Sequence, residues 1–232
     1  MDRSSLVTAY RELIARGLSQ GTAGNISLRQ AGTMLITPSA LPAAAMRAAD
    51  IAEMDVAGEG AWRGRAKPSS EWRIHRDIYR ARPEIGAVVH AHPPYATALA
   101  MARRPIPPAH YMVALFGGGD VPCAPYATFG TAELSAVAVA ALAGRTACLL
   151  ANHGCLALGR DLAEAMGRAV ELETLAQQYL LSLAAGPVLL SERELAEALA
   201  AFGEYRGVAA EAAARPAARG RPRRGQVNVL SV

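Results

Sequence analysis

Residues 87–94 read AVVHAHPP, a short apolar run with two histidines that ends at a pair of prolines. Such a run predicts a buried β-strand, and the prolines end it before residues 95–102 turn helical again. Alternate side chains of a strand leave the same face, so His90 and His92 are placed to reach one metal ion. A pair of strand histidines is as often structural as metal-binding, so the metal hypothesis needs further ligands.

The residues before this strand predict a helix, a hairpin and a second helix. Residues 4–17 carry apolar side chains at helical spacing and end at Gly17. The segment GTAGNIS (21–27) is a glycine-rich loop that leads into a strand, and a turn at Ala31-Gly32 leads into a second strand. From Ser70 to Pro83 the spacing is again helical, with Ser69 or Ser70 as the expected N-cap.

The residues after it predict three helices and another strand. The helices are expected over 132–142, 162–183 and 191–202, and a fully apolar strand over 147–151. Hairpins mixed with alternating helices indicate a single α/β or α+β domain, in which a sheet is covered by helices. We expect this domain to span residues 1–206 and residues 207–232 to form a flexible tail rich in Arg, Ala and Pro.

Charge and composition limit the classes of partner. The net charge of +4 comes from the tail, where residues 207–232 hold five arginines and one acidic residue. The remaining chain balances 19 basic against 19 acidic residues, which argues against a nucleic-acid partner. Charged residues interrupt every apolar stretch, so no membrane span is expected. Three cysteines without a CxxC pair and the absence of a secretory signal predict a cytoplasmic protein.

Two further residues complete a candidate metal site. His153 stands in Asn152-His153-Gly154 at the end of an apolar strand, and Glu71 begins a helix. Taken singly, each has an ordinary structural explanation, a strand-end histidine and a carboxylate facing a helix dipole. Together with His90 and His92 they form a donor set of three imidazoles and one carboxylate. That set suits Zn²⁺ first, with Mn²⁺, Co²⁺ and Fe²⁺ as weaker alternatives.

Small polar residues in three loops form a candidate anion site. Such loops bind phosphate through backbone N–H groups and hydroxyls, although each loop alone is equally typical of a turn. The candidate residues are Thr22, Gly24, Asn25, Thr37, Ser39, Ser69 and Ser70. Lys67 is the only lysine, so a Schiff-base mechanism would rest on that one side chain and a metal is the preferred electrophile.

Seven motifs, in order along the chain, resemble the class II aldolase and adducin-head family, and most closely its L-fuculose-1-phosphate aldolase branch. They are GTAGNIS, MLITPS, KPSSEWRIH, VVHAH, HYM, PCAPYATFGT and NHG. The resemblance covers residues 5–206 and implies an α/β fold with a central, mainly antiparallel sheet. It also implies a homotetramer with active sites between subunits.

The resemblance also implies roles for single residues. Glu71, His90, His92 and His153 match metal ligands, and Glu71 also matches the catalytic acid/base. The substrate phosphate is expected at Thr22, Asn25, Ser39, Ser69 and Ser70. Tyr111 matches a tyrosine that reaches the neighbouring subunit's site, Phe129 matches a pocket residue, and Phe202 and Tyr205 match a segment that closes over substrate. One departure is Ser39-Ala40, where the family has Thr-Gly; a positive backbone φ there would strain Ala40.

The implied activity is metal-dependent cleavage of a small ketose 1-phosphate into dihydroxyacetone phosphate and an aldehyde. L-Fuculose 1-phosphate is the first choice of substrate, and 5-deoxyribulose and 5-methylthioribulose 1-phosphates are alternatives that differ at the aldehyde end. A methylthioribulose-phosphate dehydratase or a pentose-phosphate epimerase would use the same metal and phosphate sites. A nonenzymatic adducin-like module would be expected to lack metal ligands.

Overall fold

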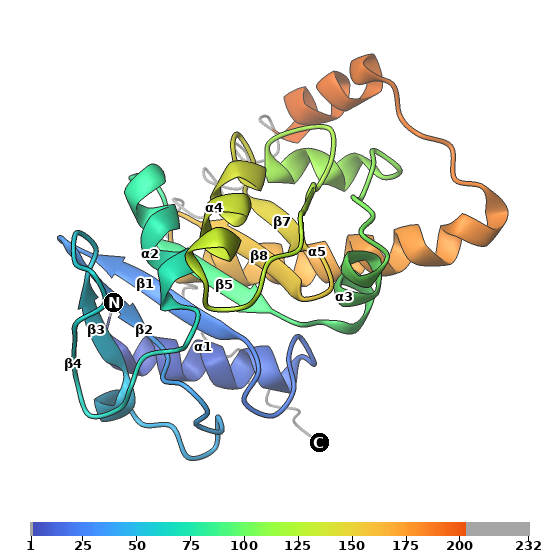
Figure 1. The fold of residues 1–232 in the computed structure, drawn as a ribbon. Helices are drawn as coiled ribbons and strands as arrows, with labels where there is room; N and C mark the ends of the chain where they lie inside the picture. The colour runs from blue at the N-terminus through green and yellow to red at the C-terminus, as the bar shows by residue number, and fades with distance from the viewer. Residues whose placement is uncertain (1, 203–232) are drawn as a thin grey trace, which may run out of the picture.

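The computed structural model describes residues 2–202, and its centre is one eight-stranded β-sheet (Figure 1). The spatial order of the strands is β4-β3-β2-β1-β5-β8-β7-β6. Their bounds are β1 Asn25–Gln30, β2 Thr33–Ile36, β3 Ala52–Asp55, β4 Trp62–Arg63, β5 Ala87–Ala91, β6 Cys123–Ala124, β7 Ala147–Leu150 and β8 Gly154–Gly159. All neighbours are antiparallel except β6 and β7. The expected α/β fold with a mainly antiparallel central sheet is confirmed.

The helices begin and end close to where their apolar spacing predicts. The α-helices are α1 Arg3–Ala15, α2 Trp72–Ala81, α3 Pro94–Met101, α4 Ala132–Ala141 and α5 Leu162–Ser182; the 3₁₀ helices are η1 Ala48–Asp50, η2 Tyr111–Phe116 and η3 Leu183–Ala185. Residues 192–202 are also helical. Side chains of Asp2, Thr131 and Asp161 cap α1, α4 and α5 by accepting backbone N–H groups. Within residues 2–202, every helix is too short or too polar to cross a bilayer.

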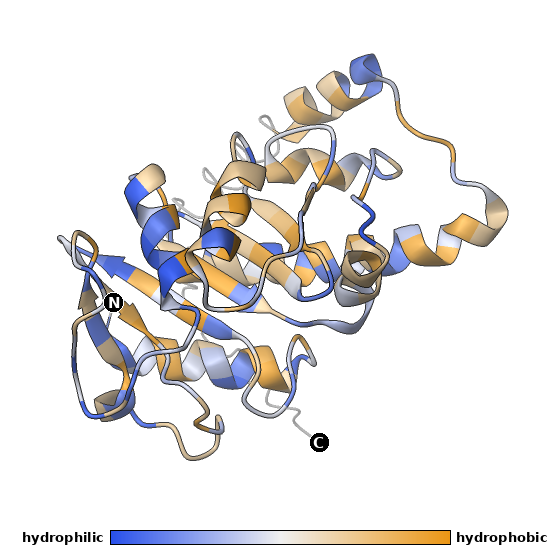
Figure 2. Ribbon diagram, viewed as in Figure 1, coloured by the Kyte–Doolittle hydropathy of each residue, from blue (hydrophilic) through white to orange (hydrophobic). Residues whose placement is uncertain are grey.

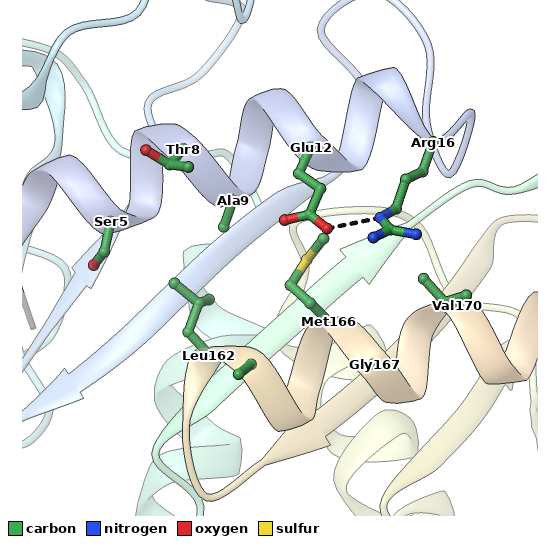
Figure 3. A pocket seen from close by; sticks show the side chains of 10 residues that line it. Ser5, Thr8, Ala9, Glu12, Arg16, Leu162, Met166, Gly167 and Val170 are labelled. Carbon is green, nitrogen blue, oxygen red and sulfur yellow. Dashed lines mark hydrogen bonds and ion pairs between the residues drawn. The ribbon is translucent and has the colours of Figure 1, made fainter. Parts of the chain in front are cut away.

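Each face of the sheet has its own hydrophobic core. Val89 of β5 belongs to a core with α1, α3 and α5, whereas Val88 belongs to a core with α2 and α4, because alternate strand residues face opposite sides. Strands β7 and β8 accordingly carry mainly hydrophobic colours in Figure 2, while α2 shows a strongly hydrophilic side. On the first face, α1 and α5 flank a groove of about 760 Å³, with the Glu12–Arg16 ion pair beside it (Figure 3).

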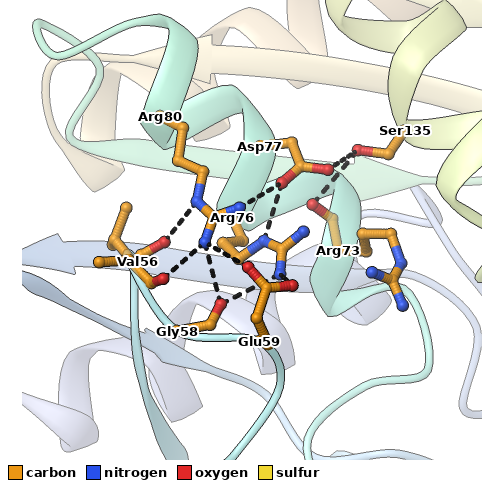
Figure 4. A network of polar contacts seen from close by, with 9 residues as sticks. Val56, Gly58, Glu59, Arg73, Arg76, Asp77, Arg80 and Ser135 are labelled. Atoms are coloured by element: carbon orange, nitrogen blue, oxygen red, sulfur yellow. Dashed lines mark hydrogen bonds and ion pairs between the residues drawn. The ribbon is translucent and has the colours of Figure 1, made fainter.

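A polar network anchors α2 on the second face (Figure 4). The buried guanidinium of Arg76 donates to the carbonyl oxygen of Gly58 at 3.1 Å and to the carboxylate of Asp77 at 2.8 Å. Asp77 also accepts from the hydroxyl of Ser135 in α4 at 2.6 Å, and Arg80 donates to the carbonyl of Val56 at 2.7 Å. Because these bonds tie α2 to a loop and to α4, they set the position of the residue that begins this helix.

Strand β8 is the main element that the sequence analysis missed. The sequence predicts a single apolar strand over 147–151 and no strand after it. In the structure the chain makes a three-residue turn after β7, returns antiparallel to it as β8 and lies between β7 and β5. Its residues are buried on both faces, so they show no polar alternation to separate them from β7. This strand places residue 153 beside the end of β5.

Candidate metal centre

Four predicted ligands from three distant segments meet at one point. Their ligand atoms all lie within 4.8 Å of one another. His90 Nε2 is 3.0 Å from Glu71 Oε2 and 2.8 Å from His92 Nε2, while His153 Nε2 is 3.3 Å from Glu71 Oε1. Donor atoms around a tetrahedral zinc ion stand about 3.3 Å apart, given bonds of 2.0–2.1 Å. The cluster is therefore close to the spacing that such an ion requires.

The strand pairing explains how His153 reaches the other histidines. Gly154 pairs with Leu150 across the β7–β8 turn, and Cys155 pairs with Ala91 at the end of β5. Asn152 takes a left-handed conformation with φ 54°, which asparagine tolerates better than most residues. The side chain of Asn152 is held by Arg103, whose Nε donates to Oδ1 at 2.9 Å. His153 is thereby fixed in a tight turn directly beside His92.

Glu71 itself occupies the N-cap position of α2, which corrects the expected cap at Ser69 or Ser70. The hydroxyl oxygen of Ser69 instead accepts the N–H of Glu71 at 3.2 Å, one step before the helix begins. Asn25 Nδ2 donates to Glu71 Oε2 at 3.0 Å. The buried Oε1 atom has no hydrogen-bond partner among residues 2–202, although it lies near His153. A buried carboxylate oxygen without a hydrogen-bond partner is destabilising unless it binds a cation.

The hydrogen bonds of His90 show which of its nitrogens faces the cluster. Nδ1 lies 2.9 Å from the carbonyl oxygen of Cys155, so Nδ1 carries the donated hydrogen and the Nε2 lone pair points at Glu71 and His92. This carbonyl contact is the usual support for a metal-binding histidine. Two imidazole nitrogens and a carboxylate oxygen at such distances repel one another unless a proton or a cation lies between them. The donor set therefore fits a divalent metal.

The charge states of the cluster favour a cation as well. Burial, reinforced by neighbouring histidine charge, lowers the pKa of His92 to about 3 and that of His153 to about 4. Burial opposes the ionisation of Glu71, but His90, His153 and Asn25 outweigh it and hold the Glu71 pKa well below its usual range. Burial also acts against charge on His90, yet Glu71 raises its pKa. His92 and His153 are therefore neutral beside an ionised Glu71, which are the protonation states in which these residues bind metal, and a bound cation would take the place of the His90 proton.

A cavity of about 290 Å³ opens beside the cluster. It is lined by Glu71, His92, Tyr126, Ala127, Phe129, Asn152 and His153. The predicted pocket residue Phe129 is thus found at the cavity, where its ring is largely exposed. Tyr126 was missed by the sequence analysis, although it belongs to the PCAPYATFGT motif. The cavity is large enough for a small sugar derivative and has aromatic walls.

The predicted phosphate loops lie next to Glu71. Gly24, with φ 75°, presses against β5, since a Cβ on it would stand 2.8 Å from the carbonyl oxygen of His90. The second and third loops run side by side, because Ser69 N–H donates to the Thr37 carbonyl and Ser39 N–H donates to the Lys67 carbonyl, both at 3.0 Å. The structure thus brings the three loops together near the metal cluster.

The loop side chains differ in how accessible they are. Thr22 and Ser70 are exposed and Ser39 is partly so, whereas Asn25, Thr37 and Ser69 are buried. The Thr37 hydroxyl accepts the backbone N–H of Ile26 at 3.1 Å, and the Asn25 amide contacts Glu71. Ala40 has φ 54°, so the anticipated left-handed residue of the second loop is present.

Tyr111 stands apart from its own chain's cavity. It begins η2, is half exposed, stacks on His110 at a centroid distance of 4.6 Å and lies 5.8 Å from the ring of Phe202. With half of its surface exposed, Tyr111 is not part of the buried core. Phe202 is partly buried against the first core, and Tyr205 lies outside the described residues.

His75 is a fully buried polar residue that was not among the predicted site residues. It lies one turn after Glu71 on α2, and an i, i+4 spacing on a helix was the signal that could have found it. Its ring contacts Asn25 and Ser27.

Comparison with known proteins agrees with this geometry. Residues 4–180 match the family described as "Class II Aldolase and Adducin N-terminal domain". A 5-methylthioribulose-1-phosphate/5-deoxyribulose-1-phosphate aldolase of Rhodospirillum rubrum is 52% identical over 204 residues, covering 88% of this chain and 91% of that protein. An L-fuculose phosphate aldolase of Escherichia coli is 46% identical over 211 residues, covering 88% and 97%.

The solved structures show the same relationship. A structure described as L-fuculose 1-phosphate aldolase superposes with a TM-score of 0.82 at 40% identity, covering 87% of this chain and 95% of that one. The match thus extends from sequence to fold over nearly the whole described chain. The chain belongs to the class II aldolase and adducin N-terminal domain family.

Proposed function

We propose that this protein is a divalent-metal-dependent aldolase that cleaves a ketose 1-phosphate into dihydroxyacetone phosphate and a small aldehyde. The observation that carries the proposal is the convergence of Glu71, His90, His92 and His153 beside three phosphate-type loops. The relatives support it, since the three proteins named above are described as sugar-phosphate aldolases. A complete ligand set also argues against a nonenzymatic role.

The metal would be held by these four residues, and zinc suits the donor set best. When bound, a divalent cation supplies Lewis-acid polarisation of the substrate's carbonyl oxygen. The substrate phosphate would be bound by the residues of the three loops, Thr22, Gly24, Asn25, Thr37, Ser39, Ser69 and Ser70. Phe129 would line the aldehyde end, and Phe202 and Tyr205 would close over it.

The protons in the cleavage must balance. The bond between C3 and C4 breaks, the C4 hydroxyl loses a proton to become an aldehyde, and C3 gains a proton. We propose that Tyr111 relays the C4 hydroxyl proton to solvent and that Glu71 passes a solvent proton to C3, so that both side chains end in the protonation state in which they began. Tyr111 is half exposed and outside its own cavity, which supports a role in the active site of a neighbouring copy within a homotetramer.

The substrate proposal rests on the relatives. The Rhodospirillum protein is described by activity on 5-methylthioribulose and 5-deoxyribulose 1-phosphates, and the Escherichia coli protein by activity on L-fuculose phosphate. These compounds share the three-carbon phosphate end and differ only at the aldehyde end. The side chains that distinguish them would therefore be the few that contact the aldehyde end, near Tyr126 and Phe129. We propose all three as candidates, acting in the cytoplasm, with residues 1–206 as the catalytic unit. The tail 207–232 lies outside the described residues.

The test is release of dihydroxyacetone phosphate from the three compounds in parallel, by the zinc-loaded protein with and without a chelator. We expect release that the chelator abolishes, and the ratio of kcat/KM values identifies the substrate. Absence of release from all three, with zinc bound, would overturn the aldolase and favour a dehydratase or an epimerase.

A further inference from the structure

A line of hydrogen bonds runs from the core of the protein to the carboxylate of Glu71. It joins Asn25 and Ser27 of β1 to His75 and Tyr79 of α2. The strand residues are two apart and the helix residues, with Glu71, four apart, so each set lies on one face of its element. All five side chains are buried, and His75 and Ser27 are fully so.

The bonds are short and continuous. Tyr79 Oη lies 2.8 Å from Ser27 Oγ, and Ser27 Oγ lies 2.7 Å from His75 Nδ1. His75 Nε2 contacts Asn25 Oδ1, and Asn25 Nδ2 lies 3.0 Å from Glu71 Oε2. His75 touches neither the other histidines nor the cavity, so the mechanism above gives it no role.

Only one direction of donation satisfies every member. The ionised Glu71 can only accept, so Asn25 must present its amide N–H and turn its carbonyl oxygen toward His75. That oxygen needs a donor, so His75 carries its hydrogen on Nε2, and Nδ1 accepts the hydroxyl of Ser27. The Ser27 oxygen in turn accepts from Tyr79. Burial lowers the pKa of His75 to about 3, which keeps the ring neutral as this pattern requires.

We propose that His75 is a positioning residue, which fixes the amide of Asn25 so that Glu71 Oε2 is held and Oε1 is left free toward His153. Without the Nε2–H donor, the Asn25 amide is free to rotate and present its oxygen to the carboxylate, which repels it. The proposal rests on the proposed role of Glu71 as a metal ligand and acid/base. Outer hydrogen bonds of this kind change metal affinity or activity about 10–100-fold when removed.

Two variants of the same residue separate positioning from packing. The amide nitrogen of His75→Gln reaches the place of Nε2 and can still donate to Asn25, whereas His75→Asn reaches only the place of Nδ1 and keeps Ser27. We expect His75→Asn to lower zinc affinity and kcat about 10–100-fold, with KM less affected. His75→Gln should retain values within a few-fold of wild type. Zinc affinity is measured by competition with a chromophoric chelator.

Two results with these variants would contradict the proposal. Wild-type zinc affinity in His75→Asn, or equal losses in both variants at equal melting temperature, would overturn the proposal. Tyr79→Phe, which removes only the outermost hydroxyl, is the control for loss of a buried hydrogen bond on the same helix face. Its zinc affinity should fall less than that of His75→Asn, and an equal or greater fall would contradict a role specific to His75.

A measurement on the unaltered protein covers the case in which His75→Asn does not fold. The ¹⁵N chemical shifts of the His75 ring in the zinc-loaded protein report its tautomer. Hydrogen on Nε2 is expected, and hydrogen on Nδ1 would reverse the donor direction and overturn the proposal. Neither zinc affinity nor the tautomer requires a substrate. A wild-type protein without aldolase activity but with the predicted variant pattern would therefore refute the proposed reaction and leave the role of His75 standing.

Discussion

Gly154 and His92 pack so closely that a Cβ on residue 154 would stand 2.6 Å from His92 Cδ2. The same atom would stand 2.5 Å from the carbonyl oxygen of Ala91, which belongs to β5 and cannot move alone. Glycine is therefore required in the turn that delivers His153, for steric reasons rather than backbone conformation. The contact links the fold of the β7–β8 hairpin to the geometry of the metal ligands.

Gly154→Ala should lower the free energy of unfolding by about 1–3 kcal/mol, the usual cost of overpacking, and weaken zinc binding by displacing His92. Urea unfolding and zinc competition measure the two effects. Gly167→Ala on α5 is the matched control, because a Cβ there meets nothing within 4 Å at the groove beside α1 (Figure 3). It should stabilise the helix by about 0.5–1 kcal/mol. Equal stability of the two variants would contradict the steric argument.

Glu71→Gln should leave zinc bound by the three histidines but abolish turnover, because the amide cannot exchange the proton assigned to C3. We expect kcat to fall by about 10²–10⁴-fold or more, because general acid–base catalysis contributes a factor in that range. Zinc content is checked by elemental analysis of the same sample. Normal cleavage by this variant would remove Glu71 from the proton transfer.

Mixed oligomers test whether Tyr111 acts in a neighbouring copy. Glu71→Gln and Tyr111→Phe should each be nearly inactive alone. When the two are unfolded together and reassembled in equal amounts, about a quarter of the sites in a cyclic tetramer combine an intact Glu71 with an intact neighbouring Tyr111. Recovery of that share of wild-type activity is expected. If both residues acted within one copy, mixing would restore nothing.

Ala40→Gly should stabilise the second phosphate loop. Ala40 has φ 54°, a conformation that costs a residue with a Cβ about 1–2 kcal/mol and glycine far less. Glycine also has more conformational freedom than alanine in the unfolded chain, which offsets part of this gain. The free energy of unfolding should therefore rise by a net amount of about 0.5–1 kcal/mol. The gain is measured by thermal unfolding, and phosphate affinity by KM. A lower melting temperature would show that the loop does not strain Ala40.

Stability of the metal-free protein should fall as pH drops below the ordinary histidine pKa of about 6.5. The pKa values of His75 and His92 lie near 3 and that of His153 near 4, chiefly through burial, so the unfolded chain binds these protons first. Their stabilisation is present above pH ~6.5 and is lost as pH falls toward those folded values. His90, whose pKa is raised, opposes this trend. Urea unfolding at pH 7.5, 6 and 5 with chelator present should show a decreasing free energy; an increase would reverse the sign.

The sequence by itself determined the helices, the β1–β2 hairpin, β5, β7 and the donor chemistry of the site. Apolar spacing located α1 through α5, the Pro93-Pro94 pair ended β5 and the Ala31-Gly32 turn joined β1 to β2. These signals act within a few residues of the chain. The four ligands were recognisable because few combinations of three imidazoles and one carboxylate serve another purpose. These inferences needed only local geometry and donor chemistry.

The tertiary structure decided what depends on long-range pairing. Insertion of β8 between β5 and β7, which no local signal distinguished from the end of β7, brings His153 to His92. The pairing of Asn25 with His90 across β1 and β5 brings the first loop to Glu71, and packing of α2 on β1 buries His75 beside Asn25. These contacts join residues 46 to 65 positions apart for Asn25–Glu71, Asn25–His75 and His90–Cys155. These contacts are stabilised by burial of the two faces of the sheet, and that burial exists only once the hydrophobic cores have assembled.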